Sequence, residues 1–148
     1  MFHIVYNMDH GSAVSLGTSS KDKGESLTRE DAGGLQNGNY LQVHFTGSCN
    51  TADFQKDCIA ERFLNNSNGG AVAYIGNSDN GYSSEIELFS YFINAWKNPQ
   101  MSHNIGNLFR KVQTSGGGGS SNRKMVLLGD PEMPVWSKTP ETLDVSVE

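Results

Sequence analysis

Short apolar runs alternate along the chain with stretches in which apolar residues recur every three or four positions. The runs are rich in β-branched and aromatic residues and apolar at consecutive positions, which is typical of strands covered on both faces. They span residues 3–7, 41–46, 71–75 and 125–128. The stretches between them have the period of helices, so the sequence predicts strands that alternate with helices.

Four helices are expected, over residues 28–33, 54–64, 84–98 and 105–112. A short side chain that accepts a hydrogen bond, followed three residues later by an acid, is the pattern of a capping box at a helix start. The predicted capping residues are Thr28 with Asp31, Asn50 or Thr51, and Ser84 with Glu87. Strands alternating with such helices predict an α/β fold, a mainly parallel sheet with helices on both faces.

The loops that follow the strands are where such a sheet carries its functional residues. In this chain they begin at Asp9, Gly47, Gly76 and Gly129. The first strand begins almost at Met1, and a buried strand without a lead-in predicts that the first strands of the domain are absent. We therefore expect residues 1–136 to form a partial domain.

Two further segments stand outside this pattern. Residues 114–121 read Thr-Ser-Gly-Gly-Gly-Gly-Ser-Ser, the composition of a flexible linker introduced by engineering, with a natural glycine-rich loop as the alternative. Residues 137–148 form a tail whose last part alternates between apolar and polar positions, as at the start of a strand in a following module.

Length and charge exclude several classes of protein. The 148 residues suffice for one domain, and a net charge of −5 provides no basic field for nucleic acid or anionic lipid. No apolar run approaches the roughly 18–20 residues that span a bilayer, and the first residues do not form a signal peptide. Cys49 and Cys58 are too few for a disulfide framework, so at least one free thiol is expected.

His10 and Cys49 each lie just after a predicted strand, so adjacent parallel strands would bring them together at one edge of the sheet. A cysteine nucleophile needs a base, donors for the developing oxyanion and access to substrate. Gly11 lets the backbone approach a substrate, and Gly47 with Ser48 predicts a tight turn that presents Cys49. We also expect Cys49 to lie at the start of the next helix, where a thiolate is favoured.

These motifs resemble those of the caspase-like cysteine peptidases, in which a His-Gly pair and a cysteine follow neighbouring strands. Further segments resemble the gingipain family in particular, in the same order along the chain, from Phe2 to about Trp136. The matching segments are residues 10–12, 47–49, 58–64, 70–76 and 127–131. The resemblance implies a caspase-like three-layer sandwich with His10 as acid and base, Cys49 as nucleophile, and an oxyanion hole formed by the backbone N–H groups of Gly11 and Cys49.

The same resemblance implies that Asn77, Ser78 and Tyr82 line the substrate pocket, in the loop after the third strand. It implies a protein or peptide substrate, a parent protein secreted or at the surface of a bacterium, and an immunoglobulin-like module after the tail. No cofactor is required; the resemblance leaves a structural calcium ion open, but assigns no residues to it. In the family, upstream residues that this chain lacks orient the histidine and shape the specificity pocket, so the preferred substrate residue is not predicted.

The other polar residues have simpler interpretations. A metal site built from His10, His44, Cys49 and Cys58 lacks the spacing of known metal motifs, so no metal is predicted. Asp9 and Asp130 are typical turn residues, with orientation of a histidine or calcium binding as alternatives. No glycine-rich segment has the pattern of a phosphate-binding loop.

The sequence therefore predicts a cysteine endopeptidase that acts through a Cys-His dyad and a thioester acyl-enzyme. A transpeptidase or sorting enzyme with the same pair is one alternative, because an amine can replace water in the second step. A catalytically inactive fragment that serves as an α/β scaffold is the other.

Overall fold

A four-stranded sheet forms the centre of the computed structural model, which describes residues 3–17, 26–82, 85–115 and 123–136. Its strands are β1 (His3–Asn7), β5 (Gln42–Thr46), β6 (Ala71–Asn77) and β7 (Met125–Gly129), in that order across the sheet. β1, β5 and β6 are parallel to one another, and β7 is antiparallel to β6. All four predicted strands are present, and the prediction of a mainly parallel sheet is confirmed.

The direction of β7 corrects one expectation. Asn77 pairs with Met125 and Ala73 pairs with Gly129, so the loop that begins at Gly129 lies at the opposite edge from the ends of β1, β5 and β6. The reason is the pair of helices between β6 and β7, which run antiparallel and return the chain to the edge it left. Asp130 is therefore far from the predicted site, and Lys124, just before β7, lies near it.

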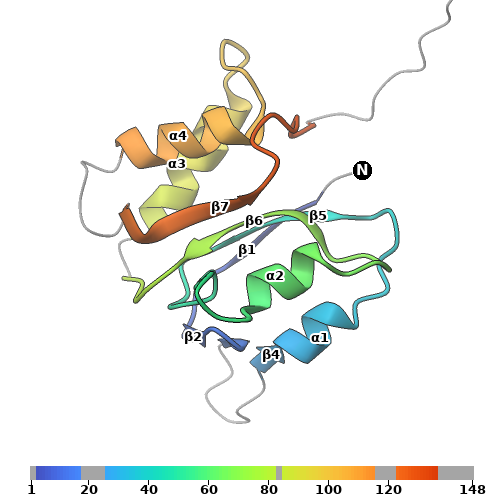
Figure 1. Cartoon of the computed structure of the whole chain (residues 1–148). Coiled ribbons are helices and arrows are strands. Elements are labelled where there is room, and N and C mark those ends of the chain that lie inside the picture. Colours follow the sequence, from blue (N-terminus) through green and yellow to red (C-terminus); the bar gives the residue numbers. More distant parts are fainter. Residues whose placement is uncertain (1–2, 18–25, 83–84, 116–122, 137–148) are drawn as a thin grey trace, which may run out of the picture.

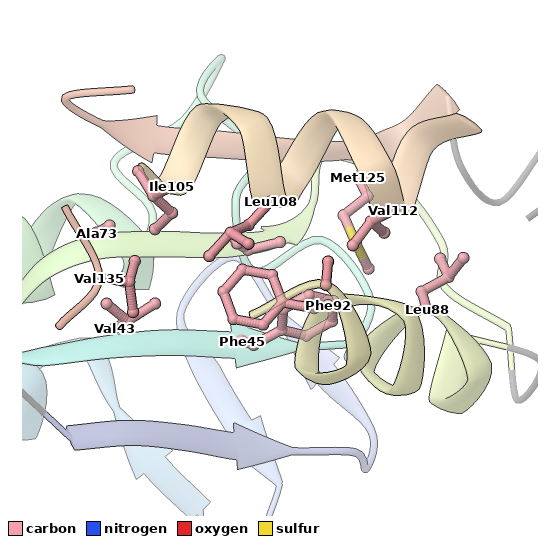
Figure 2. Packing of buried hydrophobic residues seen from close by; sticks show 12 residues of the cluster. Val43, Phe45, Ala73, Leu88, Phe92, Ile105, Leu108, Val112, Met125 and Val135 are labelled. Atoms are coloured by element: carbon pink, nitrogen blue, oxygen red, sulfur yellow. The ribbon is translucent and has the colours of Figure 1, made fainter. Parts of the chain in front are cut away.

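Helices cover both faces of the sheet (Figure 1). α1 (Arg29–Gly33) and α2 (Ile59–Leu64) lie on one face, and α3 (Ile86–Lys97) and α4 (Ile105–Ser115) lie on the other. The α3–α4 face holds the main core, in which strand and helix side chains interdigitate (Figure 2). Its buried members are Val43, Phe45, Ala73, Ile75, Leu88, Phe92, Ala95, Ile105, Leu108, Val112, Met125 and Val135. The predicted three-layer arrangement is confirmed.

A small antiparallel sheet follows β1, and the sequence pattern did not predict it. It contains β2 (Gly11–Ser12), β3 (Ser15–Gly17) and β4 (Ser26–Thr28). The sheet holds the segment after His10 in place, because the Gly17 N–H donates to the His10 carbonyl oxygen at 2.7 Å. Strands of two or three mostly polar residues carry no periodic signal, which explains why they were missed.

The predicted helix over residues 54–64 is shorter than expected. α2 begins at Ile59, with Cys58 as its N-cap residue, and residues 50–56 form turns. The Asp53 carboxylate accepts from the Lys56 ammonium at 2.7 Å and holds a turn there. Asn50 and Thr51 are therefore not capping residues, and Cys49 does not lie at a helix N-terminus.

The other helix boundaries agree better with the prediction. Thr28 caps α1 through the expected box, since the Asp31 N–H donates to Thr28 Oγ1 at 3.1 Å and the Thr28 N–H donates to Asp31 Oδ2 at 2.9 Å. α3 has Glu85 as its N-cap residue, and Ser84 lies outside the described residues.

α4 ends at Ser115, so it includes the first two residues of the predicted linker. The rest of that linker, 116–121, and the tail 137–148 lie outside the described residues. Among the described helices, none is long and apolar enough to cross a membrane.

Candidate active site

The ends of β1 and β5 bring the two predicted loops together at one edge of the sheet. Asn7 and Thr46, the last residues of these strands, are partners in the parallel register. The Gly47 N–H donates to the Asn7 carbonyl oxygen at 3.3 Å, which continues the pairing by one residue. The loop with His10 and the loop with Cys49 therefore start side by side.

Ser48 joins these loops through its hydroxyl group. Ser48 Oγ donates to Asn7 Oδ1 at 3.0 Å and accepts from the Asp9 N–H at 3.3 Å. Thr46 Oγ1 donates to the same hydroxyl at 3.0 Å and accepts from the Ser48 N–H at 3.0 Å. Ser48 and Thr46 are fully buried, so the two hydrogen bonds between them are shielded from water.

Gly11 packs directly against the turn that carries Cys49. A Cβ atom added at Gly11 would lie 2.7 Å from Ser48 Cβ, 2.9 Å from Thr51 Cγ2 and 3.0 Å from the Cys49 carbonyl oxygen. Only glycine fits at this distance, because real Cβ atoms do not approach other atoms so closely. The residue after His10 is thus in contact with the residues around Cys49.

Cys49 has a free, partly exposed thiol. Its sulfur accepts a hydrogen bond from the Gly81 N–H at 3.3 Å, and the Gly81 carbonyl oxygen lies 3.9 Å from it. The Cys49 N–H donates to no acceptor among the described residues. A free thiol and a backbone N–H without an acceptor among the described residues are therefore present at this position.

His10 is exposed, and its backbone rather than its ring is fixed. Its N–H donates to Asp9 Oδ1 at 2.7 Å, and its imidazole forms no hydrogen bond or ion pair with a described residue. The loops of His10 and Cys49 are neighbours, but their side chains are not hydrogen-bonded to each other. Hydrogen bonds between catalytic groups are often long in substrate-free enzymes and tighten when substrate binds.

The three residues expected to line a substrate pocket lie in different environments. Asn77 is fully buried, and its side chain is directed towards Glu85. Ser78 Oγ donates to the Lys124 carbonyl oxygen at 2.9 Å. Tyr82 is 48% exposed, and Lys124 Nζ lies 5.3 Å from the centre of its ring. Of the three, Tyr82 presents the largest exposed surface.

Glu85 is the residue that the sequence pattern did not single out. It is fully buried, and its Oε2 accepts from Asn77 Nδ2 at 2.6 Å, while Asn77 Nδ2 lies 3.0 Å from the Gly47 carbonyl oxygen. Burial raises the pKa of Glu85, and the Asn77 hydrogen bond and the Lys124 charge offset part of this effect. An acid at a helix start is typical of an exposed N-terminus, so nothing in the sequence indicated its burial.

The remaining candidates are buried in the core or form other hydrogen bonds. His44 and Cys58 are buried in the core on the α1–α2 face, and burial raises the pKa of the Cys58 thiol. The Asp9 carboxylate accepts from the His10 backbone rather than its ring. In the described part of the chain, no group of three or more His, Cys, Asp or Glu side chains is arranged to hold a metal ion.

Comparison with protein families matches residues 2–136 to peptidase family C25. Comparison with curated protein sequences gives no match. Among solved structures, one described as "Structure of Protease" has a TM-score of 0.78 at 18% identity, covering 99% of this chain and 39% of that chain.

A second similar structure is the Arg-specific cysteine proteinase gingipain R (RgpB), with a TM-score of 0.77 at 21% identity and 94% of this chain covered. A third is a complex of the Porphyromonas gingivalis RgpB pro- and mature domains, with a TM-score of 0.77 at 19% identity. The chain spans 34% and 35% of the lengths of these two chains. At such identities the likeness establishes a shared fold.

Proposed function

This chain belongs to peptidase family C25, and we propose that it carries the nucleophile and the base of a cysteine endopeptidase. In the proposed reaction, Cys49 Sγ attacks the carbonyl carbon of a peptide bond, and His10 takes the thiol proton. The C–N bond breaks as His10 passes that proton to the departing amine, which leaves a thioester on Cys49. Water then attacks the thioester, with His10 accepting its proton, and releases the acid and the free thiol.

The observation that supports this proposal best is the interlocking of the two loops. Ser48 ties the Cys49 turn to the end of β1, and Gly11 packs against that turn with no room for a side chain. These contacts restrict the distance between the His10 and Cys49 backbones to a narrow range. We propose that the exposed His10 side chain turns its ring towards the thiol when substrate binds.

We further propose that the N–H groups of Gly11 and Cys49 form the oxyanion hole. The Cys49 N–H has no acceptor among the described residues, as expected for a donor reserved for substrate. Tyr82, exposed beside the same edge, and Ser78 are proposed to border the substrate pocket.

The surroundings of the site are proposed from the family. We propose that residues 1–136 are one part of a larger catalytic domain, that its substrate is a protein or peptide, and that the parent protein is secreted or at the surface of a bacterium. The tail 137–148 is proposed to lead into an immunoglobulin-like module, and residues 116–121 are proposed to belong to an engineered linker.

Cleavage assays on the parent protein test the catalytic pair. Cys49→Ala is expected to reduce kcat/KM by roughly 10³-fold or more, and His10→Ala by a comparable factor, because the two residues act as a unit. Cys58→Ala is the matched control, since it removes the other thiol, which is fully buried. Full activity in the Cys49→Ala variant would contradict the proposal.

Two further measurements separate the alternatives. A peptidyl probe that reacts with thiols should label Cys49 in a manner that depends on His10, whereas an inert scaffold would label equally with and without His10. An added amine nucleophile distinguishes hydrolysis from transpeptidation, because only the second yields an amide product with that amine.

A further inference from the structure

A buried polar layer adjoins the turn that carries Cys49 and the loop that contacts its thiol. It consists of Asn77 at the end of β6, Glu85 at the start of α3, and the backbones of Gly47 and Gly81. Asn77 Nδ2 is within hydrogen-bond distance of Glu85 Oε2 and of the Gly47 carbonyl oxygen, at 2.6 and 3.0 Å. Asn77 and Glu85 are both 0% exposed, so neither side chain reaches solvent.

The backbones of Gly47 and Gly81 pack closely against this layer, with no room for a side chain at either position. A Cβ atom at Gly81 would overlap the Gly47 carbonyl oxygen and lie 2.6 Å from Asn77 Nδ2. A Cβ atom at Gly47 would lie 3.1 Å from Glu85 Oε2. The loop after β6 therefore rests on the Cys49 turn with the Asn77 amide and the Glu85 carboxyl group between them.

We infer that Glu85 is a positioning residue for Cys49, acting through Asn77 and the loop 77–82. Its carboxyl group orients the Asn77 amide, which ties the loop to Gly47, and the loop in turn holds the Gly81 N–H against Cys49 Sγ. The Gly81 N–H donates to Cys49 Sγ at 3.3 Å, so the loop fixes the orientation of the Cys49 side chain. This inference rests on the proposed function, in which Cys49 is the nucleophile.

The hydrogen-bonding groups of Asn77 and Glu85 explain why an amide and a carboxyl group are needed at these positions. The Asn77 amide has two donor hydrogens, one for Glu85 and one for Gly47, and no apolar side chain supplies either. Glu85 serves as an acceptor, and its other oxygen, Oε1, has no partner among the described residues. The charged or titratable groups that act on it electrostatically are Tyr6 from β1 and Lys124 before β7. Glutamine retains an acceptor oxygen at the same place, so it is the conservative replacement.

Alkylation of the two cysteines by iodoacetamide tests the inference, with each site quantified by peptide mass mapping across pH 5.5–9. Glu85→Ala is expected to lower the alkylation rate at Cys49 roughly tenfold near neutral pH. Glu85→Gln should stay within about twofold of the wild-type chain. Glu87→Ala, an exposed acid on the same helix, is the matched control and should have no effect. Cys58, fully buried, reports unfolding by becoming labelled.

Two results would overturn the inference. The first is a wild-type rate of Cys49 alkylation in Glu85→Ala while Cys58 stays unlabelled. The second is a decrease in the Cys49 alkylation rate in Glu85→Gln as large as in Glu85→Ala. If Glu85→Ala unfolds, Asn77→Ser removes the same hydrogen bonds with a smaller cavity and should reproduce the slowed labelling. Independently of these variants, the Gly81 amide proton should exchange faster with solvent in Cys49→Ala than in the wild-type chain, and unchanged exchange would also refute the arrangement.

The labelling experiment does not depend on peptide cleavage. Failure of the proposed function would appear as retained cleavage in the Cys49→Ala parent protein. Failure of the positioning role would appear as unchanged Cys49 labelling in Glu85→Ala, whether or not Cys49 is needed for cleavage. The two failures are therefore distinguishable.

Discussion

His44 is expected to make the stability of the fold depend on pH. It lies in the core on the α1–α2 face with 3% of its surface exposed, stacked on Tyr74 at a ring distance of 4.9 Å and beside Phe63 at 4.8 Å. Both ring nitrogens are buried and have no hydrogen-bond partner among the described residues. Burial without a partner disfavours the charged form, and it lowers the pKa of His44 from 6.5 to about 4.

The sign of the effect follows from the two pKa values. Between pH 6.5 and 4 the unfolded chain binds a proton at His44 and the folded chain does not, so the free energy of unfolding falls as the pH falls. Above pH 6.5 the contribution of His44 to the free energy of unfolding is fully present. At about 1.36 kcal/mol per pKa unit, the whole window corresponds to roughly 3 kcal/mol, of which about 2 kcal/mol is lost between pH 7.5 and 5.0.

His44→Phe isolates this contribution, because it keeps an aromatic ring in the stack and removes the titration. Urea unfolding at pH 7.5 and 5.0 should show the wild-type chain losing about 2 kcal/mol more than the variant. Asp57, whose pKa is lowered by its hydrogen bond from Arg62, titrates in both proteins and cancels in the comparison. His103→Ala, at the surface, should retain the wild-type dependence. Equal losses in the wild-type chain and His44→Phe would refute the reasoning.

Three further substitutions test the packing and the loops. Phe92→Ala removes a fully buried ring from the main core and should lower the free energy of unfolding by about 3–5 kcal/mol in urea; a loss below about 1 kcal/mol would contradict the core assignment. Gly11→Ala forces a Cβ atom against Ser48, so it should lower the free energy of unfolding by roughly 1–3 kcal/mol and alter the rate of Cys49 alkylation. Unchanged stability together with an unchanged alkylation rate would count against the close contact. Thr28→Ala removes the acceptor for the Asp31 N–H and should reduce stability by about 1 kcal/mol, whereas Thr28→Ser should restore most of it.

The sheet was predictable because its strands are apolar at consecutive positions. The runs 3–7, 41–46, 71–75 and 125–128 match the observed strands to within two residues at each end. The direction of β7 was not predictable from its own residues, because it depends on the antiparallel return of α3 and α4. A strand with the same pattern would be parallel after one helix and antiparallel after two.

The helix after Cys49 shows how periodicity can mislead. Phe54 falls at helical spacing with Cys58, yet it is 58% exposed and lies in a turn. The Ala52 N–H donates to the Asn77 carbonyl oxygen at 2.9 Å, so this segment is attached to the end of β6. A tertiary hydrogen bond of this kind overrides local helix preference, and the sequence holds no signal for it.

The position of the candidate site, by contrast, follows from a change of residue type within the strands. β5 ends in Thr46 and β6 ends in Asn77, and both polar side chains are fully buried where packing alone would favour apolar ones. Burying polar groups costs stability unless each finds partners, and here the partners are neighbouring loops: Thr46 bonds to Ser48, and Asn77 bonds to Gly47 and Glu85. At this edge the sheet buries polar side chains in place of apolar ones, and these side chains order the turn around a free thiol. Such a local loss of apolar packing is expected at a functional site, where the geometry of the loops matters more than stability.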